Sequence, residues 1–275
     1  ALFVFGIGKA AVMPFHLWLP AAMVAPTPVS ALLHAVAVVK AGVFTVLKVT
    51  VYIFGTDFIL QSGASDWLVW FAGATILIAS LVAMTKDNLK ARLAYSTVSQ
   101  LSYIVLGALL ATQASILGSI MHIAMHAFAK ITLFFGAGAI LVAAHKTEIS
   151  DMAGLGRAMP VTFGAFFIAS LSMIGLPPFG GMWSKWYLAM GTLEAGQWLL
   201  LTVLLASSLL NIAYLLPVPV RAFFGKARDG TVYTQVREAP ASCLAAMIIT
   251  SLACLVLFFY PEPFYQLAMT VAGAK

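Results

Sequence analysis

The stretch MHIAMHAFAKITLFF, residues 121–135, combines the apolarity of a membrane helix with three ionisable side chains. The apolar run around it covers residues 114–144, which exceeds the roughly 20 residues that a helix needs to cross a bilayer. His122, His126 and Lys130 recur at every fourth position, so they line one face of this helix. A charged lysine at the centre of a membrane helix costs roughly 2.5–3.5 kcal/mol, so this face is expected to meet protein or water rather than lipid.

The whole sequence has the composition of a polytopic membrane protein. Of its 275 residues, 62% are apolar and 9% are charged, against about 25% charged residues in a soluble domain. No strand-like alternation of the kind found in outer-membrane barrels is visible. The sequence predicts an all-α membrane protein with about eight transmembrane helices, near residues 1–20, 29–55, 66–85, 91–111, 114–144, 159–190, 197–225 and 241–270.

The basic residues between these helices fall on one side of the predicted membrane. That side carries Lys86, Lys90, Arg92, Lys146, Arg157, Arg221, Lys226, Arg228 and Arg237. The other side receives only Lys275, so the positive-inside rule predicts that the first side is cytoplasmic. This charge distribution explains the net charge of +6 without nucleic-acid binding, and it favours a multi-pass protein of the bacterial inner membrane.

Other features bear on where the chain begins and on its redox chemistry. It starts ALFVFGIGKA, without an initial Met or a basic leader, so the earlier helices of a longer protein are expected to precede it. Cys243 and Cys254 lie in one apolar span and are expected to be inert. There is no cysteine cluster and no GxGxxG motif after a strand, so no cofactor and no metal are expected, and any redox chemistry is assigned to partner subunits.

Lysines also occur inside three other predicted membrane segments. Lys9, Lys40 and Lys185 stand in apolar surroundings, and His34 shares a span with Lys40. Snorkelling to the membrane surface explains Lys48 at a helix end, but it does not explain Lys130 at the middle of its span. A single histidine is well explained by a bond to a neighbouring helix, whereas two histidines in register with a lysine favour a proton relay.

The preceding span contains the polar sequence YSTVSQLSY, residues 95–103. Its polar side chains share one helix face, and they are Ser96, Ser99, Gln100 and Tyr103. Small polar stripes commonly join membrane helices, and they can also hold a file of internal water. Both readings stay open, and these residues are predicted to support the relay rather than to form it.

Two of the predicted helices are interrupted next to a lysine. Pro14 follows Lys9, and the segment GLPPFGGMW precedes Lys185. The residues that break this second helix are Pro177, Pro178, Gly180 and Gly181. Proline removes a backbone donor, and the freed backbone is tolerated at membrane depth only when it is buried in protein or lines a cavity. An ordinary proline kink explains either break alone, but two breaks five spans apart favour transport and a repeated fold.

Four segments resemble one family. They are KAAVMPFHLWLPAAMVAPTPVSALLHAVAVVKAG, KARLAYSTVSQLSYIVLG, HIAMHAFAKITLFFGAGA and SLSMIGLPPFGGMWSKW, in this order over most of residues 1–190. They are similar to the antiporter-like membrane subunits of respiratory complex I (NADH:quinone oxidoreductase) and of Mrp-type multi-subunit cation/proton antiporters. The combination is nearest to a D-type antiporter subunit, since the long lateral helix of the larger subunits is absent.

The resemblance implies a fourteen-helix fold of two inverted five-helix repeats, of which this chain would hold the C-terminal part. Residues 1–55 would end the first repeat, 66–225 would form the second, and 241–270 would be the final helix of a single translocating domain. The same resemblance gives roles in a proton relay to Lys9, His34, Lys40, His122, His126, Lys130 and Lys185. The family's glutamate partner for Lys9 would lie N-terminal to this chain, so Lys9 is expected to lack that partner here.

The expected function is therefore proton translocation in a multi-subunit Na⁺/proton antiporter, or in a proton-pumping NADH:quinone oxidoreductase or related membrane hydrogenase. The expected partners are the other membrane subunits, the lipid bilayer, protons and Na⁺. Two other classes of function would also use these residues. A membrane metal or haem site would use His16, His34, His122, His126 and His145, but no HExxH, CxxC or nearby carboxylate completes it. A passive scaffold would use its lysines only to contact partner subunits.

Overall fold

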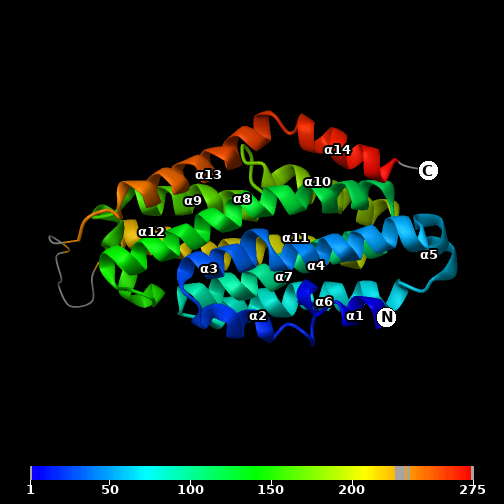
Figure 1. The fold of residues 1–275 in the computed structure, drawn as a ribbon, viewed down its shortest axis with the longest axis horizontal. Helices are drawn as coiled ribbons and strands as arrows, with labels where there is room; N and C mark the ends of the chain where they lie inside the picture. The colour runs from blue at the N-terminus through cyan, green and yellow to red at the C-terminus, as the bar shows by residue number, and fades with distance from the viewer. Residues whose placement is uncertain (1, 227–232, 234–235, 274–275) are drawn as a thin grey trace.

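The computed structural model describes residues 2–226, 233 and 236–273, and the regular structure in this part of the chain is helical (Figure 1). Six helical segments are long and apolar enough to cross a membrane: Thr27–Phe54, α6 (Asp66–Thr85), α7 (Leu89–Leu110), α8 (Gln113–Ala144), Trp198–Phe224 and α13 (Ala241–Phe259). A shorter apolar helix, α9, covers Pro160–Ile174. The prediction of an all-α membrane protein is confirmed, and α6 has the predicted bounds.

Two of these spans are composite. The span Thr27–Phe54 consists of α3 (Thr27–Ala31), the π-helical η3 (Leu32–Val36), α4 (Val38–Lys48) and the π-helical η4 (Val49–Phe54). The span Trp198–Phe224 consists of α11 (Trp198–Leu215) and α12 (Pro217–Phe224), which begins at a proline. A short helix α5 (Thr56–Ser62) precedes α6, and the short 3₁₀ turns η5 (Ile149–Met152) and η6 (Leu155–Arg157) connect α8 to α9.

Both predicted interruptions are present. The first span divides into α1 (Leu2–Gly6), η1 (Gly8–Ala10) and α2 (Trp18–Ala21), with η2 (Ala22–Val24) after it. The sixth span divides into α9 and α10 (Gly181–Glu194), separated by the non-helical residues 175–180. The two breaks coincide with the prolines and glycines that were expected to produce them.

The final span differs from its expected bounds of 241–270. Helix α13 ends at Phe259, and a separate helix, α14 (Glu262–Ala272), begins after Pro261. Proline disfavours a helical conformation at the residue before it, which explains the end of α13 at this point. Helix α14 then packs against α8, and Figure 1 shows that it changes direction relative to α13.

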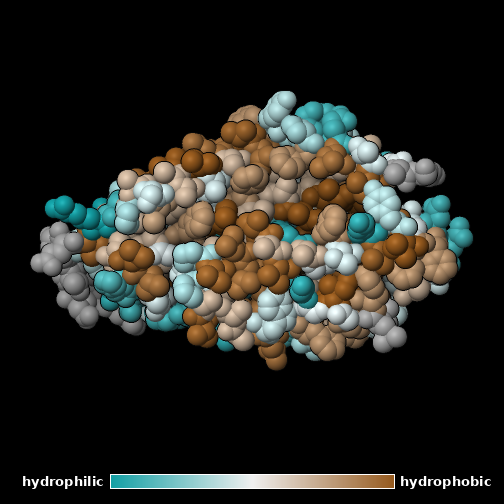
Figure 2. All heavy atoms as spheres, in the orientation of Figure 1, coloured by the Kyte–Doolittle hydropathy of each residue, from teal (hydrophilic) through white to brown (hydrophobic). Residues whose placement is uncertain are grey.

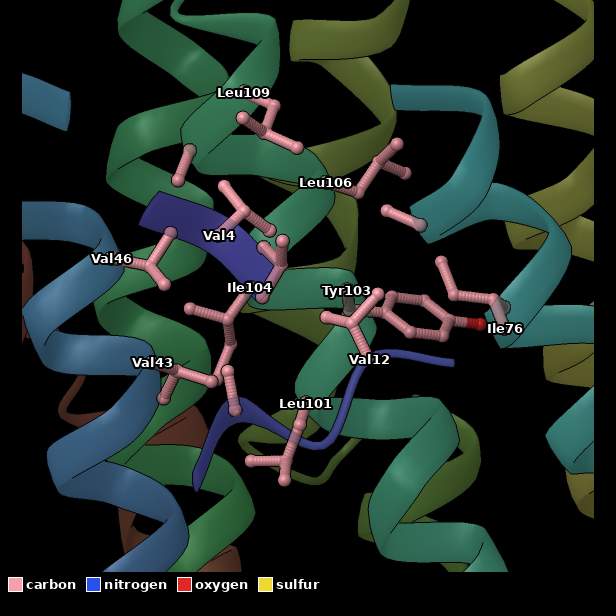
Figure 3. Close-up of a cluster of buried hydrophobic side chains, with 14 of the residues drawn as sticks. Val4, Val12, Val43, Val46, Ile76, Leu101, Tyr103, Ile104, Leu106 and Leu109 are labelled. Carbon is pink, nitrogen blue, oxygen red and sulfur yellow. The ribbon is translucent and has the colours of Figure 1, made fainter. Parts of the chain in front are cut away.

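Helix α7 lies at the centre of the bundle and contacts α4, α6, α8 and α10. Its apolar residues Leu101, Ile104 and Leu106 are completely buried. Figure 3 shows how side chains of α4, such as Val43 and Val46, meet Ile104 in one apolar cluster. The polar face of α7 is therefore held inside the protein by the packing of its apolar faces.

On the face shown in Figure 2, the surface is largely apolar across the middle of the molecule and more polar toward its two ends. Large hydrophobic side chains such as Leu209, Ile249 and Phe259 are more than 60% exposed. An apolar band of this kind is what a bilayer covers. Together with the six long apolar segments, it identifies an integral multi-pass membrane protein.

The basic loops meet at one end of the bundle. The amide of Leu89 donates to the carbonyl of Thr147 at 2.9 Å, and the amide of Ile149 donates to the carbonyl of Asp87 at 3.0 Å. The amide of Gly154 donates to the carbonyl of Arg221 at 3.3 Å. The loops that follow the third and fifth predicted spans and the last helical turns of the seventh thus share one end, as the alternation of charged loops requires.

Candidate functional site

The first polar contact of the site joins helices α4 and α8. Lys40 Nζ lies 2.8 Å from His126 Nδ1, and both side chains are buried. Helix α4 reaches this position because Gly42, two residues after Lys40, lets it pack closely on the first break. A Cβ atom at Gly42 would lie 2.5 Å from the backbone carbon of Lys9. Lys40 and the α8 histidines therefore belong to one connected group.

His122 has a hydrogen-bonding partner on each side of its ring. Its Nε2 lies 3.1 Å from Gln100 Oε1 on α7, and its Nδ1 lies 2.9 Å from Ser184 Oγ on α10. The ring stacks on Tyr103, and its centroid lies 5.8 Å from that of His126. His122 thus sits where α7, α8 and α10 meet, and its neighbour His126 continues the line toward Lys40.

Lys130 is completely buried within the helix bundle. Its Nζ donates to Ser96 Oγ at 2.8 Å and to the carbonyl of Leu93 at 3.4 Å. Both acceptors belong to α7, so the polar faces of α7 and α8 are in contact at this point. A buried amine with neutral oxygen partners is the environment expected of a functional group rather than of a surface lysine.

Two residues of this network were not predicted. Tyr214 and Asn211 of α11 lie between Ser96 and Gln100: the Tyr214 hydroxyl bonds to Ser96 Oγ at 3.1 Å and donates to Asn211 Oδ1. Gln100 Nε2 donates to the same Asn211 oxygen at 3.4 Å. A signal was present in SSLLNIAYL, residues 207–215, where Ser207, Asn211 and Tyr214 recur with helical spacing in an apolar span.

Lys185 lies at the opposite side of His122. Its Nζ donates to the carbonyl of Ile174 and to Ser208 Oγ, both at 3.1 Å, and it lies 5.2 Å from the centroid of the Tyr103 ring. The lysine lines a cavity of about 410 Å³ between α9, α10 and α11. The Lys185 amine is therefore close to Tyr103, whose ring stacks on His122, and it also borders this cavity.

His34 is buried in the π-helical segment η3, next to the relay. Its ring lies 5.1 Å from that of Phe134, measured between centroids. Both of its ring nitrogens lack a hydrogen-bonding partner within the described residues, as does His126 Nε2. Lys40 contacts His126 and not His34, although His34 and Lys40 belong to the same span. Buried polar atoms of this kind are normally satisfied by internal water.

Lys9 does not join this network. It is exposed in η1, and the break that follows it, with Pro14, lies over α4 and α6, where the amide of Met13 donates to Thr75 Oγ1 at 3.3 Å. Ser99 also lies apart, because its hydroxyl bonds to Ser80 at 2.9 Å and to the carbonyl of Ile76 at 3.1 Å. Of the four polar residues predicted on α7, Ser99 therefore joins helices, whereas Ser96, Gln100 and Tyr103 contact the relay residues.

The second break is packed tightly against its surroundings. The amide of Gly180 donates to the carbonyl of Cys254 on α13 at 2.8 Å, and a Cβ atom on Gly180 would lie 2.8 Å from that of Leu257. A Cβ atom on Gly181 would overlap the carbonyl oxygen of Ser172. The two glycines are needed for close approach, whereas Pro177 and Pro178 keep the segment out of the helix.

The five histidines considered for a metal or haem site do not come together. His16 lies in the first break, His145 ends α8, and only His122 and His126 are ring neighbours. Over residues 2–226 and 236–273, no group of three or more histidine, cysteine or acidic residues is arranged to hold a metal ion.

Comparisons with known proteins identify the family to which this helical membrane fold belongs. Residues 1–211 match the family described as NADH:quinone oxidoreductase/Mrp antiporter, transmembrane. Subunit N of an NADH-quinone oxidoreductase from Desulforudis audaxviator is 36% identical over 94% of this chain and 53% of its own length. A subunit L from Rickettsia bellii is 35% identical over 87% of this chain and 36% of its own length. The chain therefore spans about half or less of these relatives.

Solved structures have the same fold. A chain of the Mrp complex from Dietzia sp. DQ12-45-1b superposes with a TM-score of 0.87 at 25% identity, over 98% of this chain and 57% of that one. A chain of respiratory complex I from Thermus thermophilus gives a TM-score of 0.83 at 23% identity, over 98% and 57%, and is similar in fold. The expected resemblance is confirmed, and the chain belongs to the NADH:quinone oxidoreductase/Mrp antiporter transmembrane family.

Proposed function

We propose that this chain is the proton-conducting part of an antiporter-like membrane subunit in a multi-subunit assembly. The observation that carries the proposal is a nearly continuous set of amines and imidazoles inside a membrane bundle: the buried Lys40, His126, His122 and Lys130, followed by the half-buried Lys185. Membrane helices rarely hold such groups unless they serve an ion or proton path. Imidazole changes its protonation state near neutral pH, which a proton carrier requires.

The order of groups suggests a path. Lys40 contacts His126 directly, and His126 is the ring neighbour of His122. From His122 the path continues along α10 to Lys185, which borders the cavity between α9, α10 and α11. Water would complete the steps at His34 and at His126 Nε2, whose buried nitrogens have no protein partner among the described residues. Lys130 supplies a further amine beside those of Lys40 and Lys185, and its charge changes the proton affinity of the neighbouring groups.

The assembly that this subunit joins has two candidates. The curated relatives described above are named as quinone oxidoreductase subunits, which favours a redox-driven pump in the bacterial inner membrane. The chain of the Mrp complex superposes with a TM-score of 0.87, against 0.83 for the chain of complex I, which keeps a Na⁺/proton antiporter as the second candidate. Passive scaffolding is less favoured, because Lys130 is completely buried inside this chain and does not reach an outer surface. The division at residues 1–55, 66–225 and 241–270 into repeats remains part of the same proposal.

The experiment that tests the function replaces Lys130 in the full-length subunit within its native membrane complex. Lys130→Met keeps the length of the side chain and removes its charge, and Lys130→Ala removes the side chain. We expect both to abolish proton translocation in everted membrane vesicles while the complex still assembles. The matched control is Lys48→Met, because Lys48 is an exposed lysine at the end of α4. Normal translocation by both Lys130 variants would contradict the proposal.

The driving reaction is tested in the same vesicles. A redox-driven pump acidifies the vesicle interior when NADH is added and does not need Na⁺. An antiporter instead changes the internal pH when a Na⁺ gradient is imposed on energised vesicles. The response to the two additions distinguishes the two candidate assemblies.

A further inference from the structure

A chain of hydrogen bonds connects Lys130 to His122 without passing along α8. It runs from Lys130 Nζ to Ser96 Oγ at 2.8 Å, and from Ser96 to the Tyr214 hydroxyl at 3.1 Å. Tyr214 then bonds to Asn211 Oδ1. The chain continues through two amides, from Asn211 to Gln100 at 3.4 Å and from Gln100 to His122 at 3.1 Å. Ser96, Tyr214, Asn211 and Gln100 are all completely buried, so water does not compete for these bonds.

The direction of these bonds follows from the hydrogens that each group can offer. A lysine ammonium donates hydrogen bonds and accepts none, so Ser96 accepts from Lys130. The Tyr214 hydroxyl has a single hydrogen, which it donates to the Asn211 oxygen. In its contact with Ser96, Tyr214 is therefore the acceptor of the Ser96 hydrogen.

The same direction is carried on by the amides. Because Asn211 Oδ1 is an acceptor, Gln100 must present its NH₂ group to it. The other atom of that amide, Gln100 Oε1, then faces His122 Nε2. An amide oxygen accepts and does not donate, so Nε2 must carry the hydrogen. In the neutral imidazole only one nitrogen carries a hydrogen, and Nδ1 is left with a free lone pair.

Ser184 occupies the position that this lone pair requires. Its hydroxyl oxygen lies 2.9 Å from His122 Nδ1 and 3.1 Å from the carbonyl of Gly181. The hydroxyl donates to Nδ1 when His122 is neutral. When Nδ1 carries a proton, the hydroxyl accepts that bond and turns its own hydrogen to the Gly181 carbonyl. Both states of His122 are therefore satisfied on the side of α10.

We propose that Tyr214, Asn211 and Gln100 are positioning residues that fix the tautomer of His122, so that it exchanges protons only at Nδ1, on the face occupied by Ser184. This inference rests on the proposed proton translocation and deepens it. The amide chain itself does not conduct, because Asn211 Oδ1 accepts bonds from both sides and has no hydrogen to pass on. The bonds from Tyr214 through Asn211 and Gln100 thus orient His122 without a proton moving between Lys130 and His122 by this route.

The tautomer is tested directly by solid-state NMR on the assembled complex with ¹⁵N-labelled histidine. Subtracting the spectrum of a His122→Gln variant identifies the His122 ring. We expect an unprotonated nitrogen at Nδ1 and a protonated nitrogen at Nε2 under conditions where the ring is neutral. A wild-type ring that is protonated on Nδ1 and bare on Nε2 would overturn the inference, and it would leave proton translocation itself untouched.

Two variants separate positioning from simple structural support. Tyr214→Phe removes the hydroxyl that links Ser96 to Asn211, and Gln100→Leu removes the acceptor at Nε2. In both we expect the second tautomer to appear and translocation to fall roughly two- to tenfold, the range set by one lost hydrogen bond. The control is Ser170→Ala, which removes a buried hydroxyl that bonds to the carbonyl of Phe166 within α9, outside the chain of bonds. A fall in translocation with the wild-type tautomer retained, or a changed tautomer with full translocation, contradicts the proposal.

Discussion

Lys40 Nζ and His126 Nδ1 lie 2.8 Å apart although 86 positions separate them in the chain. The contact joins the composite span Thr27–Phe54 to the long helix α8 at the level where α8 carries its histidines. It also gives His126 a donor on one nitrogen and leaves the other, Nε2, without a partner in the described structure. Lys40 and His126 are thus in direct contact, and under the proposed function we expect them to act as one protonation site.

Replacing either member of this pair should impair the same step. We expect Lys40→Met and His126→Phe each to lower proton translocation by on the order of a hundredfold, the effect of losing a positioned proton-transfer group. The double variant should be no worse than the single variants, because the two side chains act together. Translocation rates in vesicles, normalised to assembled complex, measure this. Losses that multiply in the double variant would indicate two independent sites.

Gly42 should be essential for the packing of the first break. A Cβ atom at this position would lie 2.5 Å from the carbon of Lys9 and 2.6 Å from the nitrogen of Ala10, both backbone atoms. We expect Gly42→Ala to destabilise the protein by about 1–3 kcal/mol, the usual cost of overpacking. Thermal unfolding of the detergent-solubilised complex measures the change.

The control for Gly42 lies in α9. A Cβ atom at Gly164 would meet nothing within 4 Å, and alanine is favoured over glycine in a helix by about 1 kcal/mol. Gly164→Ala should therefore leave the unfolding temperature unchanged or raise it. Equal behaviour of the two alanine variants would show that α4 and the break do not pack as described.

Glu238 should stabilise the start of α9. Its carboxylate accepts bonds from the amides of Val161 and Thr162 at 2.6 and 3.2 Å, and from Thr162 Oγ1 at 2.6 Å. These are free donors at a helix N-terminus, where a negative charge is also favoured. Glu238→Ala should cost about 1 kcal/mol of stability, the usual effect of losing a cap. Glu194→Ala, at an exposed carboxylate with one long bond of 3.4 Å to Ala114, is the control and should change little.

The two cysteines should differ in reactivity. Cys243 is exposed in the first turn of α13, whereas Cys254 is buried and donates to the carbonyl of Thr250. A membrane-permeant maleimide should label Cys243 in the folded complex and reach Cys254 only after denaturation. Peptide mass spectrometry with and without denaturant gives the result, and Cys243→Ser provides the blank. Rapid labelling of Cys254 in the native complex would mean that α13 is not packed as described.

Much of the fold could be predicted because a bilayer imposes strong rules on the sequence. Helix α6 has its expected bounds since charged or turn-forming residues limit the apolar run at both ends. The interruptions near Lys9 and Lys185 follow from prolines and glycines that a regular helix does not accept. The separation of α13 from α14 was missed because the apolar run continues past Pro261, and hydropathy alone does not register a change of direction.

The site could be predicted only in part. Periodicity identified His122, His126 and Lys130, because spacing along one helix determines which residues share a face. It could not identify the partner helix of Lys40, since that pairing depends on how α4 and α8 cross. Tyr214 and Asn211 were missed for a related reason. They share a helix face with Ser207, but polar residues with this spacing commonly join helices, and only their neighbours in space connect them to the histidines.

The bond between the Gly180 amide and the Cys254 carbonyl has a mechanical consequence. An interruption in a membrane helix can act as a hinge, but here the interruption is hydrogen-bonded to α13. Moving α10, which carries Lys185, away from α13 would leave the Gly180 amide and the Cys254 carbonyl without a hydrogen-bonding partner, at a cost of a few kcal/mol. We therefore expect α13 to move together with α10.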